Sequence, residues 1–171
     1  MKKSISITVF LLFLCAALNA QTADEIKTLL ETPAVSYAQA ARFVLEAAEV
    51  NGSYDKTSGQ DAARFAVEKK WLPKNTAAQD AISLNKLSLL IMRAFNLTGG
   101  PMYNLFHNAN YSYREMVYKD LIQGRTDPQM KVSGYTMMLI VNRVLFLIEE
   151  NPWKLPEQQE KLPAGTVENE Q

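Results

Sequence analysis

Side chains that carry redox or metal chemistry are scarce in this sequence. One cysteine, Cys15, and one histidine, His107, occur among the 171 residues. A transition-metal site needs several nitrogen or sulfur ligands, so such a site is excluded, and His107 is interpreted as a capping or surface residue. The adjacent glycines Gly99 and Gly100 precede a proline and lack the spacing of a phosphate-binding loop. Since no nucleophile, base and orienting acid form a recognisable arrangement, the sequence predicts neither an enzyme nor a cofactor.

An excess of charge of either sign is also missing. The 18 Lys and Arg residues balance the 18 Asp and Glu residues. Nucleic acid is not expected as a partner, because the basic footprint that binds phosphates is absent. A mature chain of about 150 residues with this apolar fraction suits one compact domain.

A long apolar run is found only at the N-terminus. Lys2 and Lys3 precede 14 residues, 5–18, that are apolar apart from two hydroxyl side chains. A helix that spans a bilayer needs roughly 20 apolar residues, and Ala20 suits a cleavage position. We therefore expect a signal peptide at 1–20, with a retained anchor as the alternative. The mature protein is expected in the periplasm or at the cell envelope or surface, without a transmembrane segment.

Cys15 lies within this leader. It follows Leu12-Phe13-Leu14 in place of the small residue that precedes an acylated cysteine, and lipidation is kept as an alternative. Cleavage after Ala20 leaves no thiol and no disulfide, so the fold rests on its core. Without its two leader lysines the mature chain has 16 basic and 18 acidic residues, a formal charge of −2.

Signals for helix starts and helix stops recur along the rest of the chain. Thr22–Glu25, Ser36–Gln39 and Ser112–Glu115 have the form of a capping box. Prolines and glycines follow several of the apolar periodic stretches, where they end a helix. The sequence therefore predicts an all-α fold, with helices at about 22–31, 36–50, 61–70, 83–98, 102–108, 112–124 and 133–150.

An internal repeat organises these helices. A shift of 50 residues gives 8 identities over the 32 positions from 64 to 95, where about two are expected by chance. The helix starts Ser83 and Ser133 are among the identical positions, and Ser36 begins a similar helix 47 residues before Ser83. A single helix pair cannot bury its apolar face alone. We therefore expect a compact bundle of three helix-loop-helix pseudo-repeats.

Three such units behind an export signal resemble an S-layer homology (SLH) domain. The specific matches are Leu121-Ile122-Gln123-Gly124 at the end of a first helix, Asp127-Pro128 in the loop, and Arg93-Ala94 near the end of a second helix. The resemblance implies a divergent SLH-like helical domain at 21–151. The polar composition from Glu157 on separately predicts a flexible C-terminal tail at 152–171.

The family binds cell-wall polysaccharide in its grooves with an acidic residue and a Thr-Arg-Ala-Glu motif. In this chain the motif positions read Ser36-Tyr37-Ala38-Gln39, Ser83-Leu84-Asn85-Lys86 and Ser133-Gly134-Tyr135-Thr136. The family's binding arginine and glutamate are missing from all three. A serine still caps a helix at each place, so the resemblance implies the fold without implying glycan binding.

Recurring arginines and exposed tyrosines are the candidate binding residues. Guanidinium groups present a rigid fork of donors to carboxylates or anionic glycans, although they also serve as intradomain partners, and tyrosines are common at binding surfaces. The sequence predicts a non-catalytic adaptor module that binds another envelope protein. The alternatives are an anchor that binds cell-wall glycan and a structural subunit whose tail docks on a neighbour. The candidates are Arg64, Arg114, Tyr111, Tyr113, Arg93 and Arg143.

Overall fold

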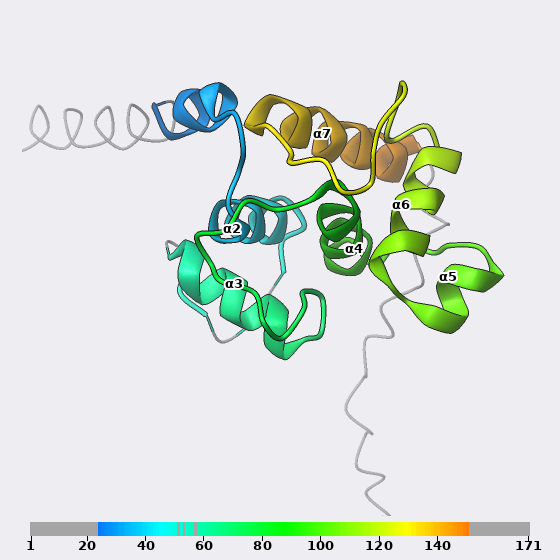
Figure 1. Cartoon of the computed structure of the whole chain (residues 1–171), viewed down its shortest axis with the longest axis horizontal. Coiled ribbons are helices and arrows are strands. Elements are labelled where there is room, and N and C mark those ends of the chain that lie inside the picture. The colour runs from blue at the N-terminus through cyan, green and yellow to red at the C-terminus, as the bar shows by residue number, and fades with distance from the viewer. Residues whose placement is uncertain (1–23, 51, 53, 57, 151–171) are drawn as a thin grey trace, which may run out of the picture.

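Helices make up the regular structure over the described ranges. The computed structural model describes residues 24–50, 52, 54–56 and 58–150. A first helix occupies residues 24–31, and Figure 1 shows the six that follow: α2 (Tyr37–Ala47), α3 (Gly59–Glu68), α4 (Leu84–Ala94), α5 (Pro101–Phe106), α6 (Ala109–Tyr118) and α7 (Gly134–Glu150). β-Pairing in these ranges is limited to two isolated bridges, Ser36 with Ala81 and Ser83 with Lys131. The predicted all-α class is confirmed.

Several predicted segments lie outside the described residues. These are the signal peptide at 1–20 with Cys15, the start of the first capping box at Thr22, and the tail at 152–171. Among the helices that the structure does describe, none combines the length and the apolar character that crossing a membrane requires.

Capping side chains explain where α2 and α7 begin. The Oγ of Ser36 accepts from the backbone N–H of Gln39 at 3.2 Å, and the Oε1 of Gln39 accepts from the N–H of Ser36 at 2.9 Å. This reciprocal pair satisfies two amides that a helix start leaves free, so the predicted capping box is confirmed. In α7, the Oγ of Ser133 accepts from the N–H of Thr136 at 3.2 Å.

The predicted start and end of α6 were wrong. Its cap is Asn108, whose Oδ1 accepts from the N–H of Tyr111 at 3.0 Å. Asparagine caps as well as serine does, and the earlier start puts Ser112 inside the helix, where its hydroxyl donates to the Asn108 carbonyl. The helix ends at Tyr118, before Asp120 in the left-handed region at φ 56°, so Gly124 lies further along in the loop.

Helix ends recur at the repeat spacing. Lys70 after α3 and Asp120 after α6 both have positive φ, at 60° and 56°, and are 50 residues apart. Glu49 after α2 and Asn96 after α4 have φ values of 51° and 50° and are 47 residues apart. α3 itself begins two residues before the predicted start, because the hydroxyl of Ser58 accepts from the N–H of Asp61.

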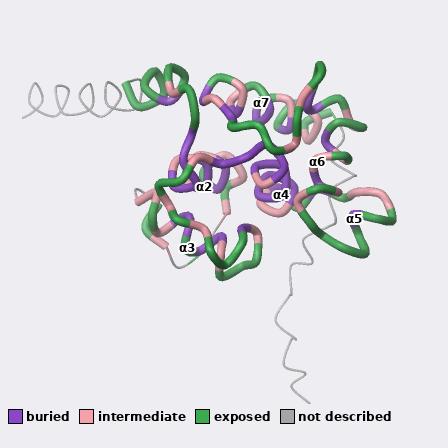
Figure 2. The backbone as a smooth tube through the Cα atoms, in the orientation of Figure 1, coloured by how far each residue is buried: buried purple, intermediate pink, exposed green. Residues whose placement is uncertain are grey.

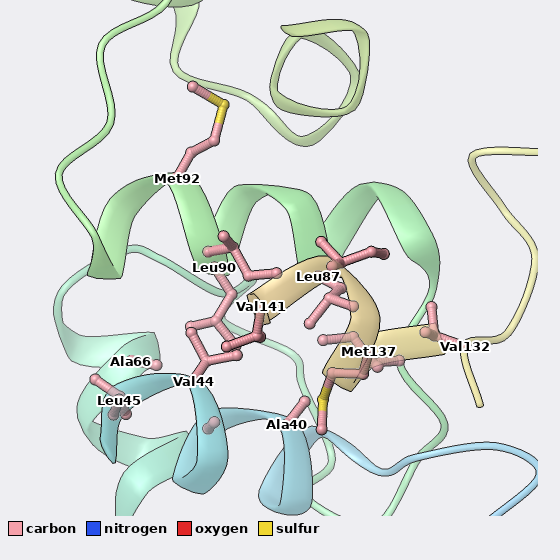
Figure 3. Close-up of a cluster of buried hydrophobic side chains, with 14 of the residues drawn as sticks. Ala40, Val44, Leu45, Ala66, Leu87, Leu90, Met92, Val132, Met137 and Val141 are labelled. Carbon is pink, nitrogen blue, oxygen red and sulfur yellow. The ribbon is translucent and has the colours of Figure 1, made fainter. Parts of the chain in front are cut away.

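α2, α4 and α7 contribute the centre of the core. In Figure 3, Val44 from α2, Leu87 and Leu90 from α4, and Met137 and Val141 from α7 lie around one apolar interior, and all are buried. α3 packs against α2, and α6 against α4. Figure 2 shows the buried backbone concentrated on α2 and α4, with mostly exposed or half-buried turns on α3, α5 and α6.

A closed ring of three backbone hydrogen bonds lies just before these three helices. Val35 donates to the carbonyl of Val132 at 2.8 Å, Val132 donates to Ile82 at 3.3 Å, and Ile82 donates to Val35 at 2.9 Å. All three side chains are fully buried. The ring therefore joins the entries to α2, α4 and α7 through their main chains.

The first amide of each of these helices also reaches another segment. Tyr37 donates to the carbonyl of Asp80 at 3.0 Å, Leu84 to Met130 at 2.9 Å, and Gly134 to Thr32 at 2.9 Å. At this place α7 also comes so close to the first helix that a Cβ on residue 134 would overlap the carbonyl oxygen of Leu29. Glycine at 134 thus lets the start of α7 approach the end of the first helix.

Candidate functional site

The residues that the structure describes contain no cluster of metal ligands. No group of three or more His, Cys, Asp or Glu side chains there has an arrangement that holds a metal ion. The described residues do form a polar cleft, an apolar groove and an exposed apolar surface, which are the kinds of feature at which proteins bind ligands or partners.

A polar cleft of about 490 Å³ lies between the start of α2 and the start of α3. Because Ser36 and Gln39 form the cap of α2 and Ser58 caps α3, the two helix starts bring hydroxyl and amide groups to the same opening. The side chains that line this polar cleft are mostly uncharged and polar: Ser36, Gln39, Ser58, Gln60 and Gln79, with Arg42 and Phe43 at its side.

One N–H group of Arg42 has no hydrogen-bond partner in the described structure. Its Nη2 lies 2.7 Å from Oε2 of Glu25, and its guanidinium lies over the ring of Phe43 at 5.6 Å. Its Nε is buried and has no hydrogen-bond partner in the described structure. Since buried donors are nearly always paired, this Nε is an exception in the described structure, as is the Nε of Arg93.

An exposed apolar surface lies on α5. Met102, Leu105 and Phe106 are 56%, 72% and 54% exposed. The ring of Tyr111 stacks on Phe106, with centroids 5.5 Å apart and an interplanar angle of 19°. We call these four residues the α5 surface.

Tyr103 holds α5 against the rest of the domain. It is the buried residue of α5. Burial raises the pKa of the Tyr103 phenol above its ordinary value of 10.0, the carboxylate of Glu115 raises it further, and Arg93 lowers it. The neutral phenol is therefore the form that this packing favours.

The two candidate tyrosines have different roles. Tyr111 belongs to the α5 surface, whereas the hydroxyl of Tyr113 donates to the carbonyl of Thr126 at 2.9 Å and lies 2.8 Å from its Oγ1. Tyr113 thereby fixes the loop that follows α6.

The four candidate arginines do not converge on one place. Arg64 pairs with Asp61 within α3, and both Arg64 and Arg114 are exposed on the outer helices α3 and α6. Arg143 donates to the carbonyl of Leu121 at 3.1 Å, and the buried Nε of Arg93 has no partner in the described structure. Arg143 therefore contacts the loop after α6, and the four arginines lie on four different helices.

Sequence reasoning missed Arg42 because it searched for arginines that recur. The repeat places Leu89 and Leu139 at the positions that correspond to Arg42. Gln60 and Gln79 were missed for a different reason. Their position beside α2 depends on how α3 and the loop before α4 pack against it. The signal that points to Arg42 is its departure from the repeat.

Taken together, the polar cleft offers hydrogen bonds to hydroxyl or amide groups, and the α5 surface offers apolar contact to a macromolecule. Neither feature, as the structure describes it, places a nucleophile beside a base. Comparisons of the chain with models of protein families, with curated proteins and with solved structures found no match.

Proposed function

We propose that the chain consists of three helix-loop-helix units of the S-layer homology type, arranged around the ring of Val35, Ile82 and Val132. Each unit supplies one residue to the ring. The first amides of α2, α4 and α7 each donate to a segment of another unit, in the opposite cyclic direction to the ring. The matched helix ends at Lys70 and Asp120 support the same relationship.

On this architecture we propose an exported, non-catalytic binding module of the cell envelope whose partner is another protein. The observation that carries the proposal is the exposure of Met102, Leu105 and Phe106 on one short helix. α5 contains no charged residue, and protein interfaces are enriched in methionine and aromatic side chains and depleted of lysine and glutamate. Exposed contiguous apolar side chains of this kind mark interaction sites.

The test is retention of envelope proteins on the immobilised chain, followed by the same measurement on charged variants. Leu105→Glu is expected to abolish retention of the specific partner, because a carboxylate at the centre of an apolar contact remains unpaired. Tyr118→Glu is the matched control, since Tyr118 is 85% exposed on α6 and lies outside the α5 surface. Equal retention by wild type and Leu105→Glu would contradict the protein-binding role.

A second candidate function is binding of cell-wall glycan in the polar cleft. Its support is the set of amide and hydroxyl side chains around Arg42 and Phe43, which is suited to the hydroxyl groups of a sugar. Gln79 lines this cleft, and Gln129, at the same repeat position one unit later, is also exposed.

These two glutamines make a matched pair for the test. If the glycan binds in the polar cleft, Gln79→Ala weakens binding to isolated wall polymer and Gln129→Ala leaves it unchanged. Binding to the polymer that soluble glycan competes, and that survives Leu105→Glu, would place the glycan function ahead of the protein function.

A further inference from the structure

An apolar groove of about 320 Å³ lies between the helix at 24–31, α2 and α7. Ile26 and Leu145 at this groove are both 37% exposed. Its lining combines apolar side chains, Ile26, Phe43, Ala47, Met138, Val141 and Leu145, with the charged or polar side chains of Glu25, Arg42, Glu46 and Asn142.

We propose that this groove is occupied by the chain's own segment 151–156, Asn-Pro-Trp-Lys-Leu-Pro, with Trp153 against its walls. The segment follows α7 directly. Leu145 lies five residues before the end of α7, or about 7.5 Å along the helix axis. Residues 151–153 reach about 10 Å when extended, which is enough for Trp153 to return to the level of Leu145.

The composition of the segment matches the groove. Trp153 is the one aromatic residue after Phe146 in the sequence, and a tryptophan gains more from apolar burial than most side chains. Lys154 is the one charged residue of the segment, and it is opposite in charge to Glu46 in the groove lining, where Glu25 already pairs with Arg42. Pro152 and Pro156 limit the backbone freedom that docking removes.

A neighbouring cleft is a poorer fit for the indole. It lies between the loop after α6 and the end of α7, and its lining includes Lys119, Asp120, Arg143 and Glu150 beside Phe146. Burial of an apolar ring there would desolvate charged groups. The lining of the apolar groove holds six apolar side chains, and two of its three charged groups, Arg42 and Glu25, already pair with each other.

The chain's two tryptophans allow a direct test. In the full chain with Trp71→Phe, Trp153 is the only tryptophan. We expect its fluorescence to be blue-shifted from that of the denatured chain, with acrylamide quenching several-fold weaker. An emission maximum and a quenching constant equal to those of the denatured chain overturn the proposal.

A matched pair of leucines on α7 localises the contact. Leu145, at the groove, is 37% exposed, and Leu139, which does not line it, is 36% exposed. Leu145→Glu is expected to shift Trp153 emission to that of an exposed indole, and Leu139→Glu to leave it unchanged. If Phe146→Glu exposes Trp153 and Leu145→Glu does not, the neighbouring cleft is the site and the proposal is wrong.

Dilution separates docking within one chain from docking between chains. Emission that does not change with protein concentration supports the proposal, and emission that turns red on dilution means that a second copy supplies the tryptophan, which overturns it. Trp71 packs edge-on against Phe65 at 6.0 Å, so Trp71→Phe has a structural cost. If that variant does not fold, 5-fluorotryptophan in the wild-type chain gives two ¹⁹F resonances. Trp153→Phe assigns them, and the response of the Trp153 signal to Leu145→Glu decides the same question.

Discussion

Val35 donates its backbone N–H to the carbonyl oxygen of Val132 at 2.8 Å, and so joins the entry of α2 to the entry of α7. Both side chains are fully buried, and a buried main-chain hydrogen bond is costly to leave unmade. With Ile82 the two residues close a ring. The ring ties together segments that are far apart in the sequence, and the first three predictions concern it and the contacts around it.

Removal of one amide from the ring is expected to destabilise the whole domain. Ile82→Pro takes away the N–H that donates to Val35, and we expect a loss of about 3 kcal/mol or more in the free energy of unfolding. Ile82→Val keeps the N–H and removes one methylene group, so its expected cost is about 0.5–1.5 kcal/mol. Urea unfolding followed by circular dichroism measures both, and equal costs for the two variants would rule out a role for the hydrogen bond.

A methyl group at position 134 is expected to push α7 away from the first helix. The Cβ of Gly134→Ala would overlap the carbonyl oxygen of Leu29, and overpacking of this kind costs about 1–3 kcal/mol or more. Gly124→Ala is the comparison, because at φ 83° it meets no atom within 4 Å and carries only a backbone strain of about 1–2 kcal/mol. Thermal unfolding should rank Gly134→Ala below Gly124→Ala, and the reverse order would contradict the close approach.

Ser83 is expected to stabilise the domain through Asn85 rather than as a helix cap. Its hydroxyl donates to the Oδ1 of Asn85 at 2.8 Å, and the Nδ2 of Asn85 donates to Asn110 at 3.0 Å. Ser83→Ala leaves the buried Oδ1 without this donor, at an expected cost of about 1–3 kcal/mol. In an Asn85→Leu background the same change should cost far less, because no acceptor is left behind. A double-mutant cycle in urea measures the coupling, and additive effects would refute it.

Tyr103 is expected to make the domain less stable at high pH. Its pKa is raised in the folded chain by burial, which outweighs the lowering by Arg93, and Glu115 adds a smaller increase. The folded chain therefore holds this proton after the unfolded chain has released it. The stabilisation is complete below about pH 10 and is lost as the pH rises through 10 toward the folded pKa.

The measurement compares the free energy of unfolding of wild type and Tyr103→Phe between pH 9 and 11. The pKa of Tyr54 is also raised, by burial and then by Glu46, and the difference between the two proteins removes its contribution. We expect the wild type to lose more stability than Tyr103→Phe over this range. Parallel curves would mean that Tyr103 ionises as it does in the unfolded chain.

Local signals in the sequence predicted the helices well where one residue decides the geometry. Ser36 with Gln39 is such a case, and the structure has this capping box. The start of α6 was predicted wrongly because Asn108 and Ser112 are both competent caps, and packing rather than capping selects between them. Gly124 was predicted to end the helix, but Asp120 takes the left-handed position instead.

The candidate binding features were harder to predict, because they depend on what the loops cover. Met102, Leu105 and Phe106 are apolar residues in a six-residue helix, and nothing in that pattern distinguishes exposed side chains from buried ones. The polar cleft brings Gln79 to the start of α2, and this meeting follows from the tertiary hydrogen bonds of Ala38 and Tyr37 to the loop that contains it. A search for recurring residues had no means to find either.

Amide hydrogen exchange at Val35, Ile82 and Val132 tests the shared centre of the three units most directly. If the units close around one ring, these amides open only when the whole domain unfolds, so their opening free energies are equal to one another and to the global free energy of unfolding. If one of the three exchanges much faster than the other two while the domain stays folded, one unit opens independently. The units would then have no common core.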